Sequence, residues 1–359
     1  MATGFFPLKI NKVNRETKDA VSIYFDIPEH LQSQFKYLPG QYLNFSVIIN
    51  GEEVRRAYSL CTSPYTDVVP GIAVKAVEGG KMSTYLNTEV KQGDVIEVMP
   101  PLGKFTANID AANSKHYVLI GGGSGITPLM AILKSVLTQE PNSKVTLVYA
   151  NRDMESIIFG DAINELQNQY GSRLTIIHSL DTPPAEWSGM SGFLTAEKVK
   201  NIATGMPGGS SAHYYICGPT PMMDIAKQGL ADGGIPADHV NTEYFTSPTS
   251  EKKEETVPVE EGDLPPLEED TKAKVNVYGS DHEIEVEAGQ TILEAAMDAD
   301  LDPPYSCQAG VCTTCRARLL SGKVVMDERE GLSDAEIEEG FILTCQSRVC
   351  TTDVSVRFE

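Results

Sequence analysis

The 359-residue sequence has little positive charge, with 29 Lys and Arg against 50 Asp and Glu and a formal net charge of −21. Nucleic acids and anionic membranes would repel such a chain, so we expect it to bind neither. The sequence also lacks the run of about 18 apolar residues that a membrane-spanning helix needs. No basic region followed by an apolar stretch opens the sequence, so we expect no secretory signal and a cytoplasmic protein.

The sequence also lacks the pattern of a disulfide-stabilised secreted protein. It has seven cysteines, an odd number in a long chain. Three of them, Cys307, Cys312 and Cys315, lie so close together that a metal or cluster site is indicated. With 41% hydrophobic and 22% charged residues the chain is not disordered as a whole, and its length suggests two or three domains.

The negative charge is concentrated towards the C-terminus. Residues 1–246 carry a net charge of −5, residues 251–270 carry −7 and residues 271–359 carry −9. Residues 247–272 have no apolar periodicity and contain four prolines, which predicts an acidic, extended linker. A tether without a binding role is the usual meaning of such a charged run.

Residues 1–112 are predicted to form an antiparallel β-barrel. Short β-branched or alternating stretches are separated by turn signals such as Pro39-Gly40 and Asn50-Gly51, a spacing typical of antiparallel barrels and sandwiches. The predicted strands are 8–13, 21–25, 43–49, 72–77 and 95–99.

The motif Arg56-x-Tyr58-Ser59-Leu60 lies within this domain. The guanidinium fork of an Arg suits a pyrophosphate, and a Tyr can stack on a planar ring. From the residues alone, a purely structural role for the motif is equally open.

Residues 113–246 are predicted to form an α/β domain with a parallel sheet. A short apolar strand runs into Gly121-Gly122-Gly123-Ser124-Gly125, and a helix is expected to open with Thr127 as its N-cap and Pro128 as its first residue. Such a loop aims backbone N–H groups at an anion, although a tight structural turn is the alternative. Further strands are predicted over 145–149, 174–179 and 214–217, with helices over 162–170 and from Met222.

Residues 273–359 are predicted to hold an iron–sulfur cluster. The spacing Cys307-x4-Cys312-x2-Cys315, with 29 residues before Cys345, is the plant-type spacing for a [2Fe–2S] cluster. A zinc site would more often show paired C-x2-C units. The surrounding elements are expected as a hairpin over 274–278 and 283–286, a helix over 291–298, and strands over 319–325 and 353–358.

Together these motifs resemble the ferredoxin-NADP reductase family fused to a C-terminal plant-type [2Fe–2S] ferredoxin of β-grasp fold. The resemblance implies bound FAD, with Arg56 on its phosphates, Tyr58 stacked on its ring and Ser59 near its reactive nitrogen. It places Val74 and Lys75 along the ribityl chain. The remaining flavin contacts it implies are Leu60, Gly80, Lys81, Met82 and Ser83.

The resemblance also implies an NAD(P)H site. Its residues are Gly123, Thr127, Arg152, Cys217, Gly218 and Pro219. Cys217 is expected beside the nicotinamide and Phe245 against the flavin, so Ser59, Cys217 and Phe245 are the predicted catalytic residues. From the residues alone, Cys217 could also be a buried apolar side chain and Phe245 a core or exposed one. Arg152 could pair with a 2′-phosphate, which favours NADPH.

The domain order resembles the reductases of bacterial multicomponent oxygenases, and most closely the phenylacetyl-CoA epoxidase reductases. The partner implied is an oxygenase or another one-electron acceptor protein. A hybrid-cluster protein, a ring-hydroxylating dioxygenase or another hydroxylase stays open as the acceptor, as does a redox carrier or sensor without turnover. The sequence shows no Glu-x-x-His pair and no Rieske Cys/His set, so we expect no oxygen activation by those routes.

Overall fold

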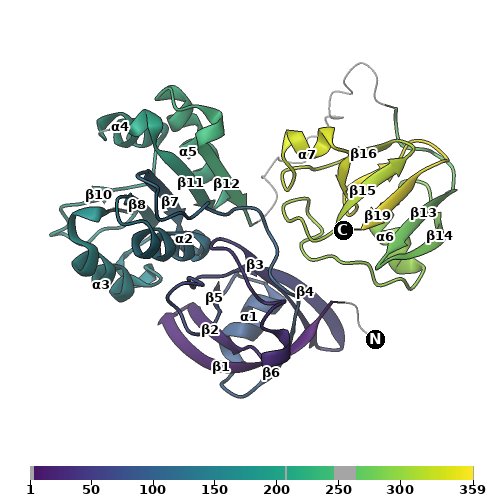
Figure 1. Cartoon of the computed structure of the whole chain (residues 1–359), viewed down its shortest axis with the longest axis horizontal. Helices are drawn as coiled ribbons and strands as arrows, with labels where there is room; N and C mark the ends of the chain where they lie inside the picture. Colours follow the sequence, from purple (N-terminus) through teal and green to yellow (C-terminus); the bar gives the residue numbers. More distant parts are fainter. Residues whose placement is uncertain (1–3, 207, 246–263, 359) are drawn as a thin grey trace. The chain divides into compact units, whose positions relative to one another are not determined.

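The protein is described by a computed structural model that covers residues 4–206, 208–245 and 264–358 (Figure 1). Phe6–Glu243 forms one compact unit, and the chain from Tyr244 onward belongs to the second. Most of the linker predicted over 247–272 therefore lies outside the described residues. No helix in the described ranges is both long and apolar enough to cross a membrane.

The first part of the larger unit is a six-stranded antiparallel sheet, as predicted. Its strands, β1 (Phe6–Thr17), β2 (Ala20–Asp26), β3 (Tyr42–Ile49), β4 (Glu52–Ser59), β5 (Gly71–Lys75) and β6 (Val95–Val98), are arranged in the order β4-β3-β6-β1-β2-β5. An isolated bridge between Leu60 and Ile72 joins the two ends of this order, so the sheet curls on itself. Its interior is filled by alternating apolar side chains such as Leu8, Ile10 and Phe45.

Of two further elements of this sheet domain, strand β4 was expected only as the second strand of a hairpin at Asn50-Gly51, and helix α1 was not predicted. Strand β4 carries the Arg56–Ser59 motif, and its polar composition conceals its alternation. Helix α1 (Lys81–Thr88) follows Gly80 directly where only a glycine-rich turn was expected. The helix buries Met82 and Leu86, which stand one helical turn apart and pack into the barrel core.

The second part of the larger unit is a sheet in the order β10-β9-β8-β7-β11-β12 with helices around it (Figure 1). Strands β7 to β11 pair in parallel, as predicted. The strands are β7 (His116–Gly122), β8 (Lys144–Asn151), β9 (Leu174–Leu180), β10 (Met190–Ser191), β11 (His213–Gly218) and β12 (Val240–Tyr244). The helices are α2 (Ile126–Gln139), α3 (Gly160–Tyr170), α4 (Ala196–Gly205) and α5 (Thr220–Asp232).

The predicted start of helix α2 was wrong. The helix begins at Ile126, with Gly125 as its N-cap residue, because a short 3-10 turn over Gly123–Gly125 leads directly into it. The Thr127 hydroxyl donates back to the Ser124 carbonyl at 3.0 Å and therefore does not cap the helix. Pro128 still lies in the first turn, where its missing N–H has no helical partner to lose.

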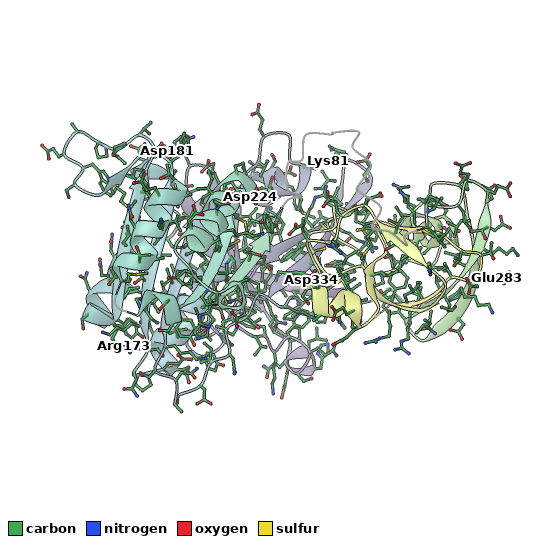
Figure 2. All side chains as sticks on the ribbon, turned by 90° about the horizontal axis from the view of Figure 1, so that it is seen from above. Lys81, Arg173, Asp181, Asp224, Glu283 and Asp334 are labelled. Atoms are coloured by element: carbon green, nitrogen blue, oxygen red, sulfur yellow. The ribbon has the colours of Figure 1, made fainter. Side chains whose placement is uncertain are left out.

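A buried carboxylate ties the barrel connection to the parallel sheet. Glu140, fully buried at the end of α2, accepts hydrogen bonds from the Asp110 amide, the Asn113 side chain, the Tyr117 hydroxyl and the Ser143 hydroxyl. Arg173, labelled in Figure 2, donates to the backbone carbonyls of Leu137, Glu140 and Ser143 around it. Burial and the Glu140 carboxylate both raise the pKa of Tyr117.

We expect Glu140→Gln to destabilise the larger unit by about 2 kcal/mol, because an amide nitrogen replaces one acceptor oxygen and leaves donors facing it unpaired. Trp187 is the only tryptophan of the chain and packs against the core of this sheet, so its fluorescence during urea unfolding reports on this region. The exposed Glu165→Gln on α3 is the control and should change stability by under about 0.5 kcal/mol. Equal small losses from both variants would contradict the role of Glu140.

The second unit contains a five-stranded sheet in the order β14-β13-β19-β15-β17. Its strands are β13 (Thr271–Val277), β14 (Ser280–Val286), β15 (Arg316–Ser321), β17 (Phe341–Leu343) and β19 (Ser355–Phe358). Helix α6 (Ile292–Asp298) lies within the helix predicted over 291–298, and Thr291 caps it in a reciprocal capping box with Glu294. Helix α7 (Asp334–Glu338) begins in the same way at Ser333.

The strand predicted over 319–325 is in fact two strands. Strand β15 ends at Ser321, and β16 (Val324–Met326) pairs with β18 (Ser347–Val349) in a separate two-stranded sheet. Gly322 lies between them at φ +79°, a left-handed conformation that a β-strand cannot continue through. A side chain there would collide with Val354, so both conformation and space require glycine.

Candidate functional site

Arg56 of the predicted flavin motif and its neighbour Arg55 have different environments on β4. Arg55 is buried and its guanidinium pairs with Glu53 at 2.9 Å. Arg56 faces out, and its Nη1 donates to the Arg55 carbonyl at 2.7 Å. Because a β-strand sends neighbouring side chains to opposite faces, Arg56 is the arginine exposed for an anionic ligand, as the sequence predicts.

The other predicted flavin contacts of this sheet differ in what they can offer. Tyr58 is half-buried against Phe45, with ring centroids 5.9 Å apart, and burial raises its pKa although Arg56 opposes the shift. The side chains of Leu60 and Val74 lie within the barrel core. Tyr58 can therefore present a ring to a ligand, whereas the side chains of Leu60 and Val74 support the sheet from behind.

The start of helix α1 supplies the second predicted anion-binding feature. Gly80 precedes the helix, and a side chain at this position would meet the Ser83 hydroxyl at 2.5 Å. The Ser83 hydroxyl accepts from the Val77 amide at 3.1 Å, so it orders the turn. Lys81 is exposed and pairs with Glu52, while Met82 is buried. The first backbone amides of α1 and the side chain of Lys81 remain as anion-binding groups here.

The glycine loop and the Cys217-Gly218-Pro219 turn lie against each other, as predicted for a nucleotide site. A side chain at Gly125 would lie 2.0 Å from the Cys217 carbonyl, so only glycine allows the loop to pass there. In contrast, a side chain at Gly123 would meet nothing within 4 Å. Gly123 has φ +52°, a left-handed backbone conformation that favours glycine. The loop therefore leaves open space beside its backbone amides, which is what a dinucleotide phosphate needs.

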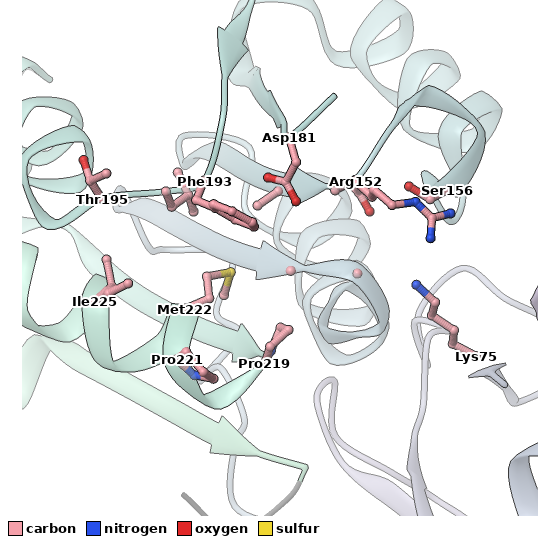
Figure 3. A pocket seen from close by; sticks show the side chains of 15 residues that line it. Lys75, Arg152, Ser156, Asp181, Phe193, Thr195, Pro219, Pro221, Met222 and Ile225 are labelled. Atoms are coloured by element: carbon pink, nitrogen blue, oxygen red, sulfur yellow. The ribbon is translucent and has the colours of Figure 1, made fainter. Parts of the chain in front are cut away.

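A pocket of about 600 Å³ opens beside this loop, at the ends of β7, β8 and β9 (Figure 3). Lys75 and Arg152 bring positive charge to it, and Asp181 brings negative charge. The Arg152 Nε atom also pairs with Asp153 at 2.9 Å. Phe193, 75% exposed, and Met222 provide apolar surface. The mixture of cations, a carboxylate and apolar side chains suits a nucleotide with its phosphates, ribose and base.

Three polar side chains from separate strands meet at the edge of β11. Ser59 at the end of β4 donates to the Glu243 carboxyl on β12 at 3.2 Å. Burial raises the pKa of Glu243 to about 8. Burial, together with the negative charge of Glu243, raises the pKa of the Cys217 thiol. The raised pKa favours the protonated form of Glu243 near neutral pH, and the raised pKa of Cys217 favours its uncharged thiol.

Glu243 is a site residue that the sequence reasoning missed. It stands two residues before Phe245, in a stretch that was considered only for its aromatic side chain. Phe245 is 39% exposed, and its predicted contact with a flavin remains a prediction. Of the predicted catalytic residues, Ser59 and Cys217 share the environment of Glu243.

Lys198 is a second missed residue. Its ammonium group donates to the carbonyls of Ser191, Gly192 and Phe193 at 2.6, 3.3 and 2.7 Å. These carbonyls belong to the loop that carries Phe193 into the pocket (Figure 3). No sequence motif marks this lysine, because the three acceptors are backbone atoms.

The four predicted cluster cysteines come together in the second unit as two pairs. The Cys307 and Cys312 thiols interact with each other, as do those of Cys315 and Cys345. Hydrogen bonding with Cys312 and with backbone amides lowers the pKa of Cys307. The Ala309 amide donates to Cys307 Sγ at 3.3 Å.

This arrangement fits a cluster of two irons. Within the described ranges no group of three or more His, Cys, Asp and Glu side chains is arranged around a single metal position. Two thiol pairs are what two adjacent irons require. The Ser306 hydroxyl is buried beside Cys307, with no hydrogen-bond partner among the described residues, and could donate to a cluster sulfur.

The two remaining cysteines serve the core. Cys61 is buried and its thiol donates to the Gly71 carbonyl at 3.3 Å. Cys350 is buried as well, and its thiol donates to the Arg348 carbonyl at 3.8 Å.

Three families match consecutive parts of the chain. They are the oxidoreductase FAD-binding domain over residues 7–107, the oxidoreductase NAD-binding domain over 119–228 and the 2Fe-2S iron-sulfur cluster binding domain over 275–350. The predicted FAD, NAD(P) and iron–sulfur domains and the predicted fold class are thereby confirmed.

Curated relatives match over nearly their whole length. The chain is 36% identical to one of the subunits of the 1,2-phenylacetyl-CoA epoxidase of Escherichia coli, over 99% of this chain and 98% of the relative. It is also 36% identical to the 3-ketosteroid-9-alpha-monooxygenase ferredoxin reductase component of Rhodococcus rhodochrous, over 98% and 96%. Among solved structures, phthalate dioxygenase reductase matches with a TM-score of 0.58 and 25% identity, over 99% of this chain and 98% of that one.

Proposed function

Because the chain belongs to the family of oxygenase reductase components that carry FAD-binding, NAD-binding and 2Fe-2S domains, we propose that it passes electrons from NADPH to the oxygenase of a phenylacetyl-CoA epoxidase. The observation that carries this proposal is that all three cofactor sites lie on one chain. A nicotinamide donates two electrons as a hydride, a [2Fe–2S] cluster accepts one at a time, and a flavin can do both. A chain with all three can therefore connect a two-electron donor to a one-electron acceptor.

The residues of the chain position these groups. Arg56 and the start of α1 would hold the flavin phosphates, and Tyr58 would stack on its ring. The loop at Gly123 and the turn at Cys217 would hold the pyridine nucleotide. Ser59, hydrogen-bonded to protonated Glu243, offers a hydroxyl beside the site with no carboxylate charge at neutral pH.

We propose three domains with boundaries at 1–112, 113–246 and 273–359. The interval between β6, which ends at Val98, and β7, which starts at His116, supports the first boundary. Strand β13 starts at Thr271, two residues before the proposed third domain. We also propose a cytoplasmic protein, which is supported by the use of a pyridine nucleotide and by a cysteine pattern that suits a cluster rather than a disulfide framework.

NADPH is proposed as the donor because Arg152 and Lys75 both reach the pocket. We expect Arg152→Ala to raise the KM for NADPH about tenfold, because the variant loses a charged hydrogen bond to the 2′-phosphate. The KM for NADH, which has no 2′-phosphate, should stay within about twofold of the wild-type value. The exposed Lys200→Ala on α4 is the control.

An equal rise for both donors would assign Arg152 to the diphosphate that they share. A wild-type preference for NADH would overturn the proposed donor and direct attention to Asp181, a carboxylate that can accept from a ribose hydroxyl.

Two observations support an oxygenase as the electron acceptor: the similarity to the phenylacetyl-CoA epoxidase subunit and the negative charge of the second unit. The second unit is strongly acidic, and we propose that this charge steers it onto a basic surface of the acceptor. The decisive experiment is to capture the acceptor with the full-length holoprotein at low salt, identify it, and measure NADPH-driven electron transfer to it as salt rises. We expect to capture a di-iron oxygenase that acts on an acyl-CoA. We also expect the rate of electron transfer to this oxygenase to fall as the salt concentration rises.

Other results would redirect the proposal. A captured hybrid-cluster protein or ring-hydroxylating dioxygenase would replace the acceptor and keep the reductase activity. NADPH binding with negligible cytochrome c reduction would identify a carrier or sensor instead. Transfer rates independent of salt would contradict electrostatic docking.

A further inference from the structure

The cysteine pairs of the second unit lie on two separate stretches of chain that must be held together. Cys307, Cys312 and Cys315 lie on the loop that precedes β15, whereas Cys345 lies between β17 and β18. Any side chain that bonds to both stretches fixes the distance between the thiol pairs. Gln346, immediately after Cys345, does so.

The amide nitrogen of Gln346 contacts both stretches. Its Nε2 donates to the Gln308 carbonyl at 3.1 Å, on the cysteine loop, and to the Cys345 carbonyl at 3.0 Å, on its own stretch. The same nitrogen lies 3.8 Å from Cys345 Sγ, within the longer reach of hydrogen bonds to sulfur. Gln346 therefore links the two ligand segments, with one N–H on the Gln308 carbonyl and the other shared between the carbonyl and the sulfur of Cys345.

The backbone of Gln346 is fixed as well. Its amide donates to the Leu343 carbonyl at 2.9 Å, and its carbonyl accepts from the Asp327 amide at 2.9 Å. The side chain is half-buried, and its Cγ would lie 3.1 Å from a Cβ added at Gly310. With both ends held, the side-chain amide has little freedom to turn away.

The loop that Gln346 contacts needs such support. Gln308 has φ +54° and Gly310 has φ +73°, so two of its residues are left-handed, one of them without the freedom of glycine. The hydrogen bond to the Gln308 carbonyl acts at this strained residue. The strained turn in turn allows the Ala309 amide to face Cys307 Sγ.

We infer that Gln346 is a positioning residue that holds the two cysteine segments in register and helps to set the reduction potential of the bound cluster. A donor directed at a ligand sulfur stabilises the more negative, reduced cluster and so raises its potential. Loss of the Gln346 hydrogen bonds would let the two cysteine segments separate, and the cluster would dissociate faster.

The test uses the full-length holoprotein and measures the midpoint potential of the cluster by a redox titration followed by electron paramagnetic resonance. Gln346→Met keeps the length of the side chain and removes the donor. We expect a midpoint potential more negative than that of the wild type and a several-fold faster loss of the visible cluster absorbance in the presence of an iron chelator. Reduction of the flavin by NADPH, which does not involve this residue, should be unchanged.

Two further variants keep the inference testable. Ser280→Met places the same replacement residue at an exposed position on β14, on neither cysteine stretch, and should leave the potential at the wild-type value. Gln346→Asn retains an amide one methylene shorter and should give an intermediate shift. If Gln346→Met is purified without its cluster, the potential of Gln346→Asn decides.

A wild-type potential and a wild-type rate of cluster loss in the Gln346 variants would overturn the inference. A lower melting temperature with no change in potential would assign Gln346 to fold stability alone, and would also overturn it.

Discussion

Cys312→Ser should abolish electron delivery to cytochrome c, with a loss of at least about 100-fold, while NADPH still reduces the flavin at a rate within about twofold of wild type. The Cys312 thiol is buried and pairs with Cys307, so serine removes a ligand from one half of the two-pair arrangement. The flavin and nucleotide motifs lie in the other compact unit and do not depend on this thiol.

Three measurements separate these steps. Iron content and the electron paramagnetic resonance signal report the cluster, stopped-flow bleaching of the flavin reports the first step, and cytochrome c reduction reports delivery. Cys350→Ser is the matched control, because Cys350 is also a buried cysteine of the same unit but lies outside the ligand spacing. Its delivery rate should match that of the wild type.

Two outcomes would count against this assignment. Full delivery by Cys312→Ser without a cluster would mean that the flavin transfers electrons directly to the acceptor. Equal losses in Cys312→Ser and Cys350→Ser would mean that the ligand set is misassigned.

The rate of flavin reduction by NADPH should fall as pH rises through about 8, the value to which burial raises the pKa of Glu243. Below this pH the carboxyl is protonated and uncharged beside Ser59. Above it the negative charge of the half-buried carboxylate faces a site that must accept a hydride, which is also negative. If the ionised form is inactive, the wild-type rate at pH 9 should be about tenfold below its plateau.

Glu243→Gln isolates this effect. Glutamine keeps the size of the side chain and an oxygen that can accept from Ser59, but it does not ionise. The variant should therefore keep its low-pH rate across the same range. Glu243→Ala also loses the support of Ser59 and should reduce flavin about 100-fold more slowly at pH 7.

Stability should follow the same titration with a defined sign. A carboxyl whose pKa is raised in the folded protein binds its proton more tightly there than in the unfolded chain, whose ordinary value is 4.5. The free energy of unfolding should therefore decrease as pH rises from about 4.5 to about 8 and then level off. In Glu243→Gln this contribution should vanish, and an unchanged pH profile of both rate and stability would contradict the assigned pKa.

The strongest predictions were those whose physical cause is local in the chain. The strands and helix around the cysteines were predicted from alternation and from amphipathic spacing over 291–298, both readable within a few residues. The apolar strand into the glycine loop likewise led to a parallel sheet. The start of α2 was misplaced because the 3-10 turn at Gly123–Gly125 depends on how closely the loop passes Cys217, which local preferences do not encode.

The amino-acid sequence alone determined the iron–sulfur site, because the cysteine spacing is a short pattern with a direct chemical cause, whereas the glycine loop and the Arg-x-Tyr-Ser motif indicated NAD(P) and FAD only through their resemblance to a known family. Only the tertiary structure decided which groups act together. Ser59 and Glu243 are 184 residues apart in sequence yet share a hydrogen bond. Burial raises the pKa of Glu243. Lys198 and Gln346 each bond to backbone carbonyls of another segment. Those features exist only when distant segments pack together, and no residue pattern along the chain records them.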